Sequence, residues 1–436
     1  MNRFLSIIAL ILFDVLAIFI AIALAVSLRK IFNIFFDVPV IDYSYLSFGS
    51  AYITLIFILV YFGIYTKRFD FWHETKIVIR SSFLSFAILL AGLVLDQNAE
   101  YYSRSTLILI FLLTTITIPS TKLITKKLLY KIGIWKKTAK VITDNENFKS
   151  TLFDDYYLGY VKSSDSNHNT LFIDSVNLSK DKLNKIIEEN IKNSREIIFT
   201  PVLSGYDFSQ SYIYNVFSSR TNVFTLENNL ISKTNKFIKS AIDYILVIGS
   251  SFLWAPVLLI IAIWVRKEDS KGDVFFKQRR LGINGKEFFC YKFRSMYSDQ
   301  SFMTEWLEKH PDEKAYYDIY HKYMNDPRIT KVGAFLRKTS LDELPQLLNV
   351  LRGEMSLIGP RPYMVIEKQD IGRKAPLVLA VKPGITGLWQ VSGRSGVDFN
   401  ERVEMDVWYM KNWSLWNDII ILIKTFQTVI NRDGAC

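Results

Sequence analysis

The chain has 436 residues, of which 50% are hydrophobic and 15% are aromatic, and its 53 lysines and arginines outnumber 42 acidic residues for a net charge of +11. An apolar content this high is unusual for a protein of the aqueous compartments and indicates a membrane. The charge suits an anionic lipid surface and phosphorylated substrates equally well, and we expect no nucleic-acid partner. Two cysteines without a CxxC pattern and four scattered histidines form no visible zinc site or Ser/His/Asp triad.

Four apolar runs begin the chain, at about residues 5–28, 46–65, 77–95 and 105–121. Each is close to the ~20 residues that a helix needs to cross about 30 Å of hydrocarbon. The first run is too long for the core of a signal peptide and has no small-residue cleavage site, so we expect it to stay attached. The sequence therefore predicts a four-helix transmembrane bundle.

The loops between these runs indicate the orientation of the bundle. "TKRFDFWHETK" after the second run and "TKLITKKLLYKIGIWKKTAK" after the fourth are rich in lysine and arginine, whereas "DQNAEYYSR" after the third holds only Arg104. Because positively charged loops stay on the cytoplasmic side, both ends of the bundle are expected to face the cytoplasm.

Asp14 interrupts the first apolar run with an ionisable group. Such a residue inside a membrane span is a functional candidate. The interpretation that we favour is structural, an aspartate that faces the interior of the bundle and hydrogen-bonds to its neighbours.

Residues 138–231 are more polar and alternate short apolar strands with helical patterns, such as "AKVIT", "NTLFID" and "KDKLNKIIEENIKNS". This alternation predicts a small α/β domain of the βαβ type. The segment "VITDNENF" after the first strand lacks the GxGxxG that lets a backbone approach a pyrophosphate. We therefore expect a cytoplasmic domain with a regulatory or assembly role, and nucleotide binding is the alternative.

The apolar stretch 240–265, "SAIDYILVIGSSFLWAPVLLIIAIWV", is long enough to span a membrane but holds Pro256 near its middle. A proline inside a helix removes a backbone hydrogen bond and costs about 3 kcal/mol, so we expect a break there. Lysines and arginines flank both ends, and a true crossing would place one cluster outside the cytoplasm. These features favour a helix that dips into the membrane and returns; an ordinary fifth span kinked at Pro256 is the alternative.

A strongly basic segment, "FKQRRLGINGKEFFCYKFRSM", precedes the adjacent carboxylates Asp342 and Glu343 and the Pro360-Arg361-Pro362 triplet. Two neighbouring carboxylates in a basic field suit a nucleophile for phosphorus beside a ligand for a divalent cation. Arg361 between two prolines offers a preorganised guanidinium to a phosphate. Taken alone, an Asp-Glu pair is more often part of a solvated helix surface.

The combination of motifs is more specific. The segments "KFRSM", "DPRITKVGAFLRKTSLDELPQLLNVLRGEMSLIGPRP", "VKPGITGLWQVSGRS" and "VEMDVWYMKNWSLWNDIIILIKT" closely resemble the bacterial polyprenyl-phosphate phosphoglycosyltransferases, over residues 235–436. The likeness extends more loosely to the rest of the chain, as in members that resemble undecaprenyl-phosphate galactose or glucose phosphotransferases. It implies three domains: a four-span transmembrane bundle (1–137), a degenerate Rossmann-like cytoplasmic domain (138–231), and a re-entrant helix with an α/β catalytic domain on the inner leaflet (232–436).

The resemblance also assigns roles to residues. Asp342 matches the nucleophile that forms a phosphosugar-aspartyl intermediate, Glu343 its partner near Mg²⁺, and Arg361 the phosphate-binding arginine. Further basic and polar positions match those that line the site or bind the nucleotide sugar: Lys292, Arg294, Arg337, Lys382, Gln390 and Arg394. We expect the metal and the cluster around Arg337 and Arg361 to lower the pKa of Asp342 despite the neighbouring Glu343.

One feature departs from the family pattern. Many members have Ser-Pro at the break of the re-entrant helix, whereas this chain has Ala255-Pro256. We therefore expect Ser250, Ser251 or a bound water to satisfy the carbonyl that the break frees, or the break to differ in shape. Near the C-terminus, the aromatic residues Trp408, Tyr409, Trp413 and Trp416 fit either the membrane interface or ordinary core packing.

The function that the resemblance implies is transfer of a sugar 1-phosphate from a UDP-sugar to undecaprenyl phosphate, with release of UMP. This is the initiating step of capsule, exopolysaccharide or O-antigen synthesis at the bacterial inner membrane. A non-catalytic membrane scaffold for polysaccharide assembly is the alternative, and a homodimer is left open. The sugar is not identified by any motif.

Overall fold

The computed structural model describes residues 2–33, 49–95, 103–163, 170–175, 178–190, 196–200, 212–216, 221–225, 229–230, 232–320, 323–392 and 397–431. The chain divides into two compact units, residues 1–204 and residues 205–436. The three domain boundaries expected from the sequence stay a prediction.

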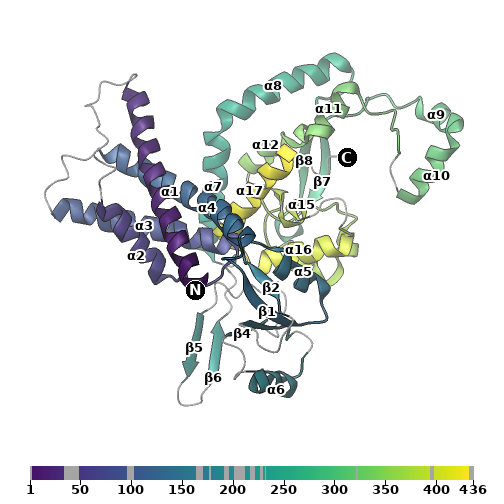
Figure 1. The fold of residues 1–436 in the computed structure, drawn as a ribbon. Helices are drawn as coiled ribbons and strands as arrows, with labels where there is room; N and C mark the ends of the chain where they lie inside the picture. Colours follow the sequence, from purple (N-terminus) through teal and green to yellow (C-terminus); the bar gives the residue numbers. More distant parts are fainter. Residues whose placement is uncertain are drawn as a thin grey trace. The chain divides into compact units, whose positions relative to one another are not determined.

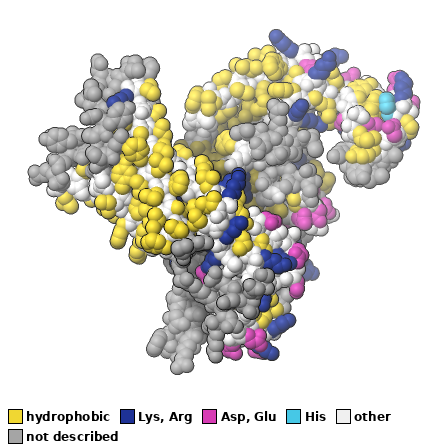
Figure 2. All heavy atoms as spheres, in the orientation of Figure 1, with side chains coloured by type: hydrophobic (Ala, Val, Ile, Leu, Met, Phe, Trp, Pro, Cys, Tyr) yellow, Lys and Arg dark blue, Asp and Glu magenta, His cyan; other side chains and the backbone are white. Residues whose placement is uncertain are grey.

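The first unit contains three helices that are long and apolar enough to cross a membrane. They are α1 (Asn2–Asn33), α3 (Phe71–Leu95) and α4 (Arg104–Lys131), and Figure 2 shows hydrophobic side chains gathered over this part of the chain. The second expected span forms α2 (Gly49–Tyr61), which has only 13 residues. A helix of that length falls short of the ~20 residues that a crossing needs, so the fourth span stays a prediction.

A cluster of opposite charges is buried among these helices and explains Asp14. Its Oδ2 lies 2.8 Å from Lys122 Nζ and accepts a hydrogen bond of 2.8 Å from the Tyr65 hydroxyl. Lys122 Nζ also lies 3.4 Å from Glu74 Oε1, and Lys126 pairs with the same carboxylate. All four charged side chains are at most 1% exposed. The structural interpretation of Asp14 as an interior, hydrogen-bonded residue is confirmed.

This cluster yields a stability prediction. Asp14→Ala leaves a buried ammonium with one partner fewer, and breaking a buried ion pair costs about 3–5 kcal/mol of unfolding free energy. We expect the double variant Asp14→Ala/Lys122→Ala to regain part of this loss, because Glu74 and Lys126 remain as a balanced pair. Thermal unfolding in detergent measures both. Glu146→Ala, which breaks an exposed pair with Lys149, serves as the control and should cost no more than about 1 kcal/mol. An Asp14→Ala protein as stable as the wild type would contradict the prediction.

A parallel sheet follows the helices within the first unit. Its strands are β1 (Lys137–Ile142), β2 (Tyr160–Lys162), β3 (Thr170–Ile173) and β4 (Glu196–Phe199), in the order β2-β1-β3-β4. Helix α5 (Glu146–Asp154) joins β1 to β2, and α6 (Lys180–Asn190) lies between β3 and β4 in sequence. All three strand pairs are parallel, as alternating strands and helices require.

The second unit begins with the antiparallel pair β5 (Tyr212–Val216) and β6 (Thr221–Thr225). The apolar stretch then forms two helices, α7 (Lys233–Gly249) and α8 (Ser251–Glu268). The chain bends by 64° from one helix to the next (Figure 1). The bend lies at Ser250 and not at Pro256, which sits in the second turn of α8, so the predicted position of the break is wrong. A proline disturbs the turn before it, where its missing N–H leaves a carbonyl unpaired and its ring crowds that carbonyl.

Side chains satisfy the carbonyls at the bend. The Ser250 hydroxyl donates to Leu246 O at 2.6 Å, and the Trp254 indole donates to Val247 O at 2.9 Å. The Ser250 hydroxyl thus binds a carbonyl in the last turn of α7, whereas the turn before Pro256 lies in α8, so the replacement expected for the hydroxyl missing at Ala255 stays a prediction. The bend is therefore stabilised locally by side chains within the two helices.

The remaining elements surround a small α/β core. They are β7 (Phe275–Leu281), β8 (Glu287–Phe293), α9 (Met303–Lys309), α10 (Pro311–Tyr320), α11 (Lys331–Thr339), α12 (Gln346–Leu351), β9 (Ser356–Ile358), α13 (Lys368–Ile371), α14 (Ala375–Val378), β10 (Gly384–Thr386), α15 (Leu388–Val391), α16 (Phe399–Lys411) and α17 (Leu415–Asn431). Strands β7 and β8 form an antiparallel hairpin, and β9 pairs with β10 in parallel.

Two of the C-terminal aromatic residues belong to the core of this unit. Tyr409 is 1% exposed and Trp413 is 5% exposed, and both pack in one cluster with Ile358 and Ile421. Core packing is therefore correct for these two residues, while Trp408 and Trp416 are half-buried.

Candidate active site

The two adjacent carboxylates lie at the end of a short, well-capped helix. Helix α11 begins after Thr330, whose hydroxyl accepts from Gly333 N at 2.8 Å. The carboxylate of Glu268, the last residue of α8, accepts from the free N–H groups of Lys331 at 2.8 Å and Val332 at 3.0 Å. These bonds satisfy backbone donors that a helix start leaves unpaired and tie α11 to the end of the apolar helix pair.

The chain then changes direction at a single residue. Ser340 has φ 56°, in the left-handed region that non-glycine residues rarely adopt, and a 3₁₀ turn at Leu341–Glu343 follows. Leu341 packs on the cluster of Ile261, Val265 and Leu336, so the turn that carries Asp342 and Glu343 rests on α8. A backbone conformation of this kind persists where the surroundings enforce it, which is typical of functional sites.

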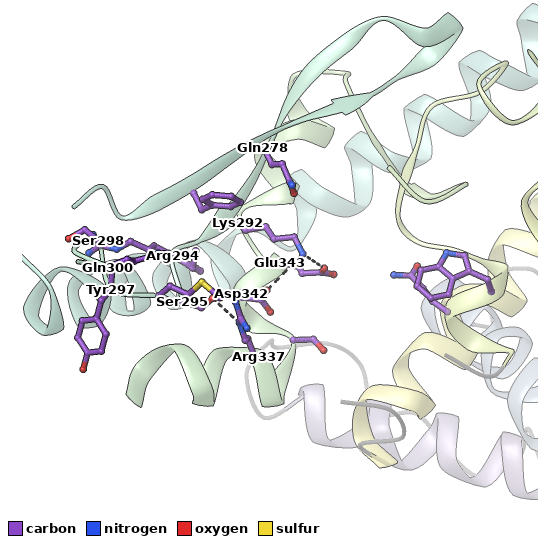
Figure 3. A pocket seen from close by; sticks show the side chains of 16 residues that line it. Gln278, Lys292, Arg294, Ser295, Tyr297, Ser298, Gln300, Arg337, Asp342 and Glu343 are labelled. Atoms are coloured by element: carbon purple, nitrogen blue, oxygen red, sulfur yellow. Dashed lines mark hydrogen bonds and ion pairs between the residues drawn. The ribbon is translucent and has the colours of Figure 1, made fainter. Parts of the chain in front are cut away.

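Asp342 and Glu343 face a cavity of about 730 Å³ in the second unit. Its walls come from β7, β8 and the loop after it, the end of α11, the 3₁₀ turn and α15 (Figure 3). The residues that line it are Phe276, Gln278, Lys292, Phe293, Arg294, Ser295, Met296, Tyr297, Ser298, Gln300, Arg337, Ser340, Asp342, Glu343, Trp389 and Gln390.

Lys292 and Arg337 flank the two carboxylates. Lys292 Nζ lies 2.6 Å from Glu343 Oε1 and 4.0 Å from Asp342 Oδ2. Arg337 Nε donates to Ser295 Oγ at 2.9 Å, which holds its guanidinium beside Asp342 (Figure 3). The structure therefore brings Asp342, Glu343, Lys292 and Arg337 together as the sequence motifs predicted.

The pKa of Asp342 is raised above its ordinary value, chiefly because burial desolvates the carboxylate. Lys292 and Arg337 lower this pKa and Glu343 raises it, but the cations do not prevail. The expected lowering included a bound Mg²⁺ and therefore stays a prediction for the site with its metal and substrate. The sequence showed the neighbouring charges but not the burial, and Asp342 is only 16% exposed.

The other predicted residues lie at different distances from the cavity. Arg294 lines it, but its guanidinium lies 3.3 Å from the Asp269 carboxylate and donates to Asp269 O at 2.6 Å. Gln390 lines it too, and its amide donates to Ile385 O at 3.2 Å. Lys382 does not line it, and Arg394 lies outside the described residues.

Arg361 sits beside the cavity rather than in its wall. Its guanidinium lies 5.9 Å from the ring centre of Trp389, which lines the cavity, and 3.7 Å from Glu367 Oε1. Arg402 lies over the same ring at 5.2 Å. The sequence analysis did not identify Trp389 as a site residue, although an aromatic residue in "GLWQ" close to the basic motifs could have indicated one.

Asp342 and Glu343 are also the candidate ligands for a metal ion. No group of three or more His, Cys, Asp or Glu side chains gathers within the described part of the chain. Asp342 and Glu343 supply two adjacent carboxylates in an open cavity, and Mg²⁺ is usually held by one or two carboxylates together with substrate phosphates. The donor set therefore fits a magnesium ion that arrives with a phosphorylated substrate.

Comparisons with known proteins identify the family to which these residues belong. The family model described as bacterial sugar transferase matches residues 234–432. An undecaprenyl-phosphate galactose phosphotransferase of Salmonella typhimurium is 36% identical over 403 residues, which cover 85% of this chain and 84% of that protein. A UDP-galactose-lipid carrier transferase of Erwinia amylovora is 35% identical with the same coverage. A UDP-glucose:undecaprenyl-phosphate glucose-1-phosphate transferase of Escherichia coli is 37% identical over 236 residues, 51% of this chain and 48% of that protein.

Proposed function

The chain belongs to the bacterial sugar transferase family, and from this premise we propose that it transfers a sugar 1-phosphate from a UDP-sugar to undecaprenyl phosphate. The reaction releases UMP and begins the synthesis of a surface polysaccharide. The observation that carries the proposal is the pair Asp342 and Glu343, flanked by Lys292 and Arg337 in one cavity. The names of the relatives supply the acceptor and the class of donor.

In the first step the Asp342 carboxylate attacks the phosphorus that bears the sugar. A bond forms between a carboxylate oxygen and this phosphorus, and the bond to the oxygen that bridges the two phosphates breaks. UMP leaves with the electron pair, and the sugar phosphate stays on Asp342 as an acyl phosphate. Lys292 and Arg337 offset the negative charge that the diphosphate brings toward the two carboxylates.

In the second step a phosphate oxygen of undecaprenyl phosphate attacks the same phosphorus. The bond to Asp342 breaks, the carboxylate is regenerated, and a polyprenyl-diphosphate sugar forms. Asp342 and Glu343 would hold Mg²⁺ together with the phosphates of the donor, and the bound ion would supply charge neutralisation at the transferring phosphoryl group.

The protein's own groups predict the pH dependence of this reaction. Asp342 must be ionised to attack, and burial already raises its pKa. Because Lys292 lowers that pKa, Lys292→Met should raise it further. As the pH is lowered, the variant should then lose activity at a higher pH than the wild type. The midpoint of the acid limb in a pH–rate profile measures this effect. Lys309→Met, at an exposed position on α9, should leave the midpoint in place; a shift to lower pH in Lys292→Met would contradict the assignment.

We place the bend of α7 and α8 in the cytoplasmic leaflet of the inner membrane, with both ends in the cytoplasm. Exposed apolar side chains on both helices, including Phe237, Ile245 and Phe252, suit this site. Lys236→Cys and Lys267→Cys, introduced singly into a variant without native cysteines, should resist a membrane-impermeant thiol reagent in intact cells. Labelling of the cysteine at 267 from outside would establish a span instead.

The experiment that tests the function measures lipid-linked product. Membranes that contain the protein are incubated with undecaprenyl phosphate and a panel of radiolabelled UDP-sugars, and the lipid is extracted. We expect one or a few sugars to label the lipid, and Asp342→Asn membranes to give none. Lipid that stays unlabelled with every sugar, from a folded protein, would favour a non-catalytic scaffold.

A further inference from the structure

The turn Gly359–Tyr363, which carries Arg361, is fixed through its backbone. Four hydrogen bonds reach it from neighbouring segments: Gly359 N to Thr386 O at 2.9 Å, Gly384 N to Pro360 O at 2.8 Å, Arg280 Nη1 to Pro362 O at 3.0 Å, and Leu281 N to Tyr363 O at 2.8 Å. The rings of Pro360 and Pro362 also set the φ angles of these two residues. The amide N–H of Arg361 itself is bound by none of these partners.

A buried carboxylate from a helix distant in sequence binds that N–H. Asp406, in the middle of α16, is 0% exposed. Its Oδ2 accepts from Arg361 N at 3.2 Å and from the hydroxyl of Tyr363 at 2.8 Å. Tyr363 is itself 1% exposed. One oxygen of Asp406 therefore binds the turn on both sides of Pro362.

Burial of the Asp406 carboxylate costs folding free energy. Its other oxygen, Oδ1, is buried and has no hydrogen-bond partner among the described residues. Burial raises the pKa of Asp406 to about 7, against the weaker effects of Tyr363 and Arg361. Burying an incompletely paired carboxylate opposes folding, and an apolar side chain would fill the same volume at lower cost. We therefore attribute the role of Asp406 to the geometry of the turn and not to the stability of the fold.

We propose that Asp406 is a positioning residue for Arg361: by holding the amide of Arg361 and the ring of Tyr363, it aims the guanidinium past Trp389 toward the phosphates of the donor. This inference rests on the proposed function, because it takes Arg361 as a phosphate-binding group. Asp406 touches no substrate and acts only through Arg361. Reactions of this type depend on placement, and a displacement of about 1 Å can cost about a hundredfold in rate.

The same unit holds a matched control. Asp418, at the start of α17, is also buried and also binds a tyrosine, accepting from the Tyr409 hydroxyl at 2.7 Å. Its second oxygen accepts from the Trp413 indole at 2.9 Å and lies 2.7 Å from Lys239 Nζ. These contacts involve no atom of the turn Gly359–Tyr363. The Tyr409 hydroxyl also lies 3.2 Å from Ile358 O, just before the turn, but Asp418 itself binds no atom of the turn and serves as the matched buried carboxylate.

A double-mutant cycle tests the proposal. The rate of UMP release per folded enzyme is measured for the wild type, Arg361→Ala, Asp406→Ala and the double variant, with thermal unfolding of each in parallel. We expect Asp406→Ala to slow the reaction by about tenfold to a hundredfold but to change the rate by less than about twofold in the Arg361→Ala background. Asp406→Asn, which keeps an oxygen that can accept from Arg361 N, should retain most of the rate. It also keeps the test available if Asp406→Ala does not fold.

The controls separate the possible failures. Asp418→Asn should lower the rate by a similar factor with or without Arg361. Equal losses from Asp406→Ala in both backgrounds would overturn the proposal while leaving the proposed function intact. A wild type that releases no UMP with any UDP-sugar would instead refute the function. The cycle is then run on UDP binding by calorimetry, where an Asp406 effect that persists without Arg361 again overturns the inference.

Discussion

Asp342→Asn is expected to fold, to bind UDP-sugar and to form no lipid-linked sugar, with activity at least about a thousandfold below the wild type. The amide has nearly the shape of the carboxylate but lacks its charge and almost all of its nucleophilicity. Because burial opposes ionisation of Asp342, the neutral residue should leave the protein at least as stable at neutral pH. Loss of activity would then not reflect unfolding.

Three measurements on one preparation establish this result: thermal unfolding, UDP binding by calorimetry, and product formation with the sugar found to be the donor. Glu343→Gln should also be severely impaired, because Glu343 binds Lys292 and lies next to the nucleophile. Glu305→Gln, on the exposed surface of α9, should behave as the wild type. More than a tenth of wild-type activity in Asp342→Asn would exclude the carboxylate as the nucleophile.

Removal of divalent cations is expected to have the second largest effect. A diphosphate donor adds several negative charges to a cavity that already holds Asp342 and Glu343, and the cations closest to them are Lys292 and Arg337. A hard divalent ion contributes several kcal/mol at a phosphoryl group, so excess EDTA should reduce turnover by at least about a hundredfold.

The chelation experiment requires dialysis of tightly bound metal before assay, followed by return of individual ions. Mg²⁺ should restore the rate, and UDP binding should weaken in EDTA for the wild type more than for Glu343→Gln. Undiminished turnover in EDTA after dialysis would show that the basic side chains suffice without a metal.

Much of the site could be predicted because the motifs are local. Asp342 and Glu343 are neighbours in sequence, Lys292 lies near the end of strand β8 in a recognisable basic segment, and Arg337 lies five residues before Asp342. Their side chains meet because α11 and β8 both pack on α8, through Leu336 and Phe293. When sequence motifs lie on elements that pack directly against each other, the geometry of the site can be predicted from the motifs.

The features that the sequence did not predict are those that depend on tertiary contacts. The bend at Ser250 depends on side-chain hydrogen bonds from Ser250 and Trp254, which a proline in the sequence does not reveal. The burial that raises the pKa of Asp342 likewise comes from tertiary packing, which the neighbouring charges in the sequence do not show. Asp406 and Arg361 are far apart in sequence and meet through a turn, so no local pattern pointed to their contact.

The central claim is a covalent phosphosugar on Asp342, and a single-turnover experiment with donor alone tests it most directly. Enzyme mixed with its UDP-sugar, without undecaprenyl phosphate, should release up to one equivalent of UMP in a burst. The tryptic peptide that contains Asp342 should gain the mass of a sugar phosphate, and added lipid phosphate should remove it. Absence of both burst and adduct, with product formed only when donor and lipid are present together, would contradict the account and favour direct attack by the lipid.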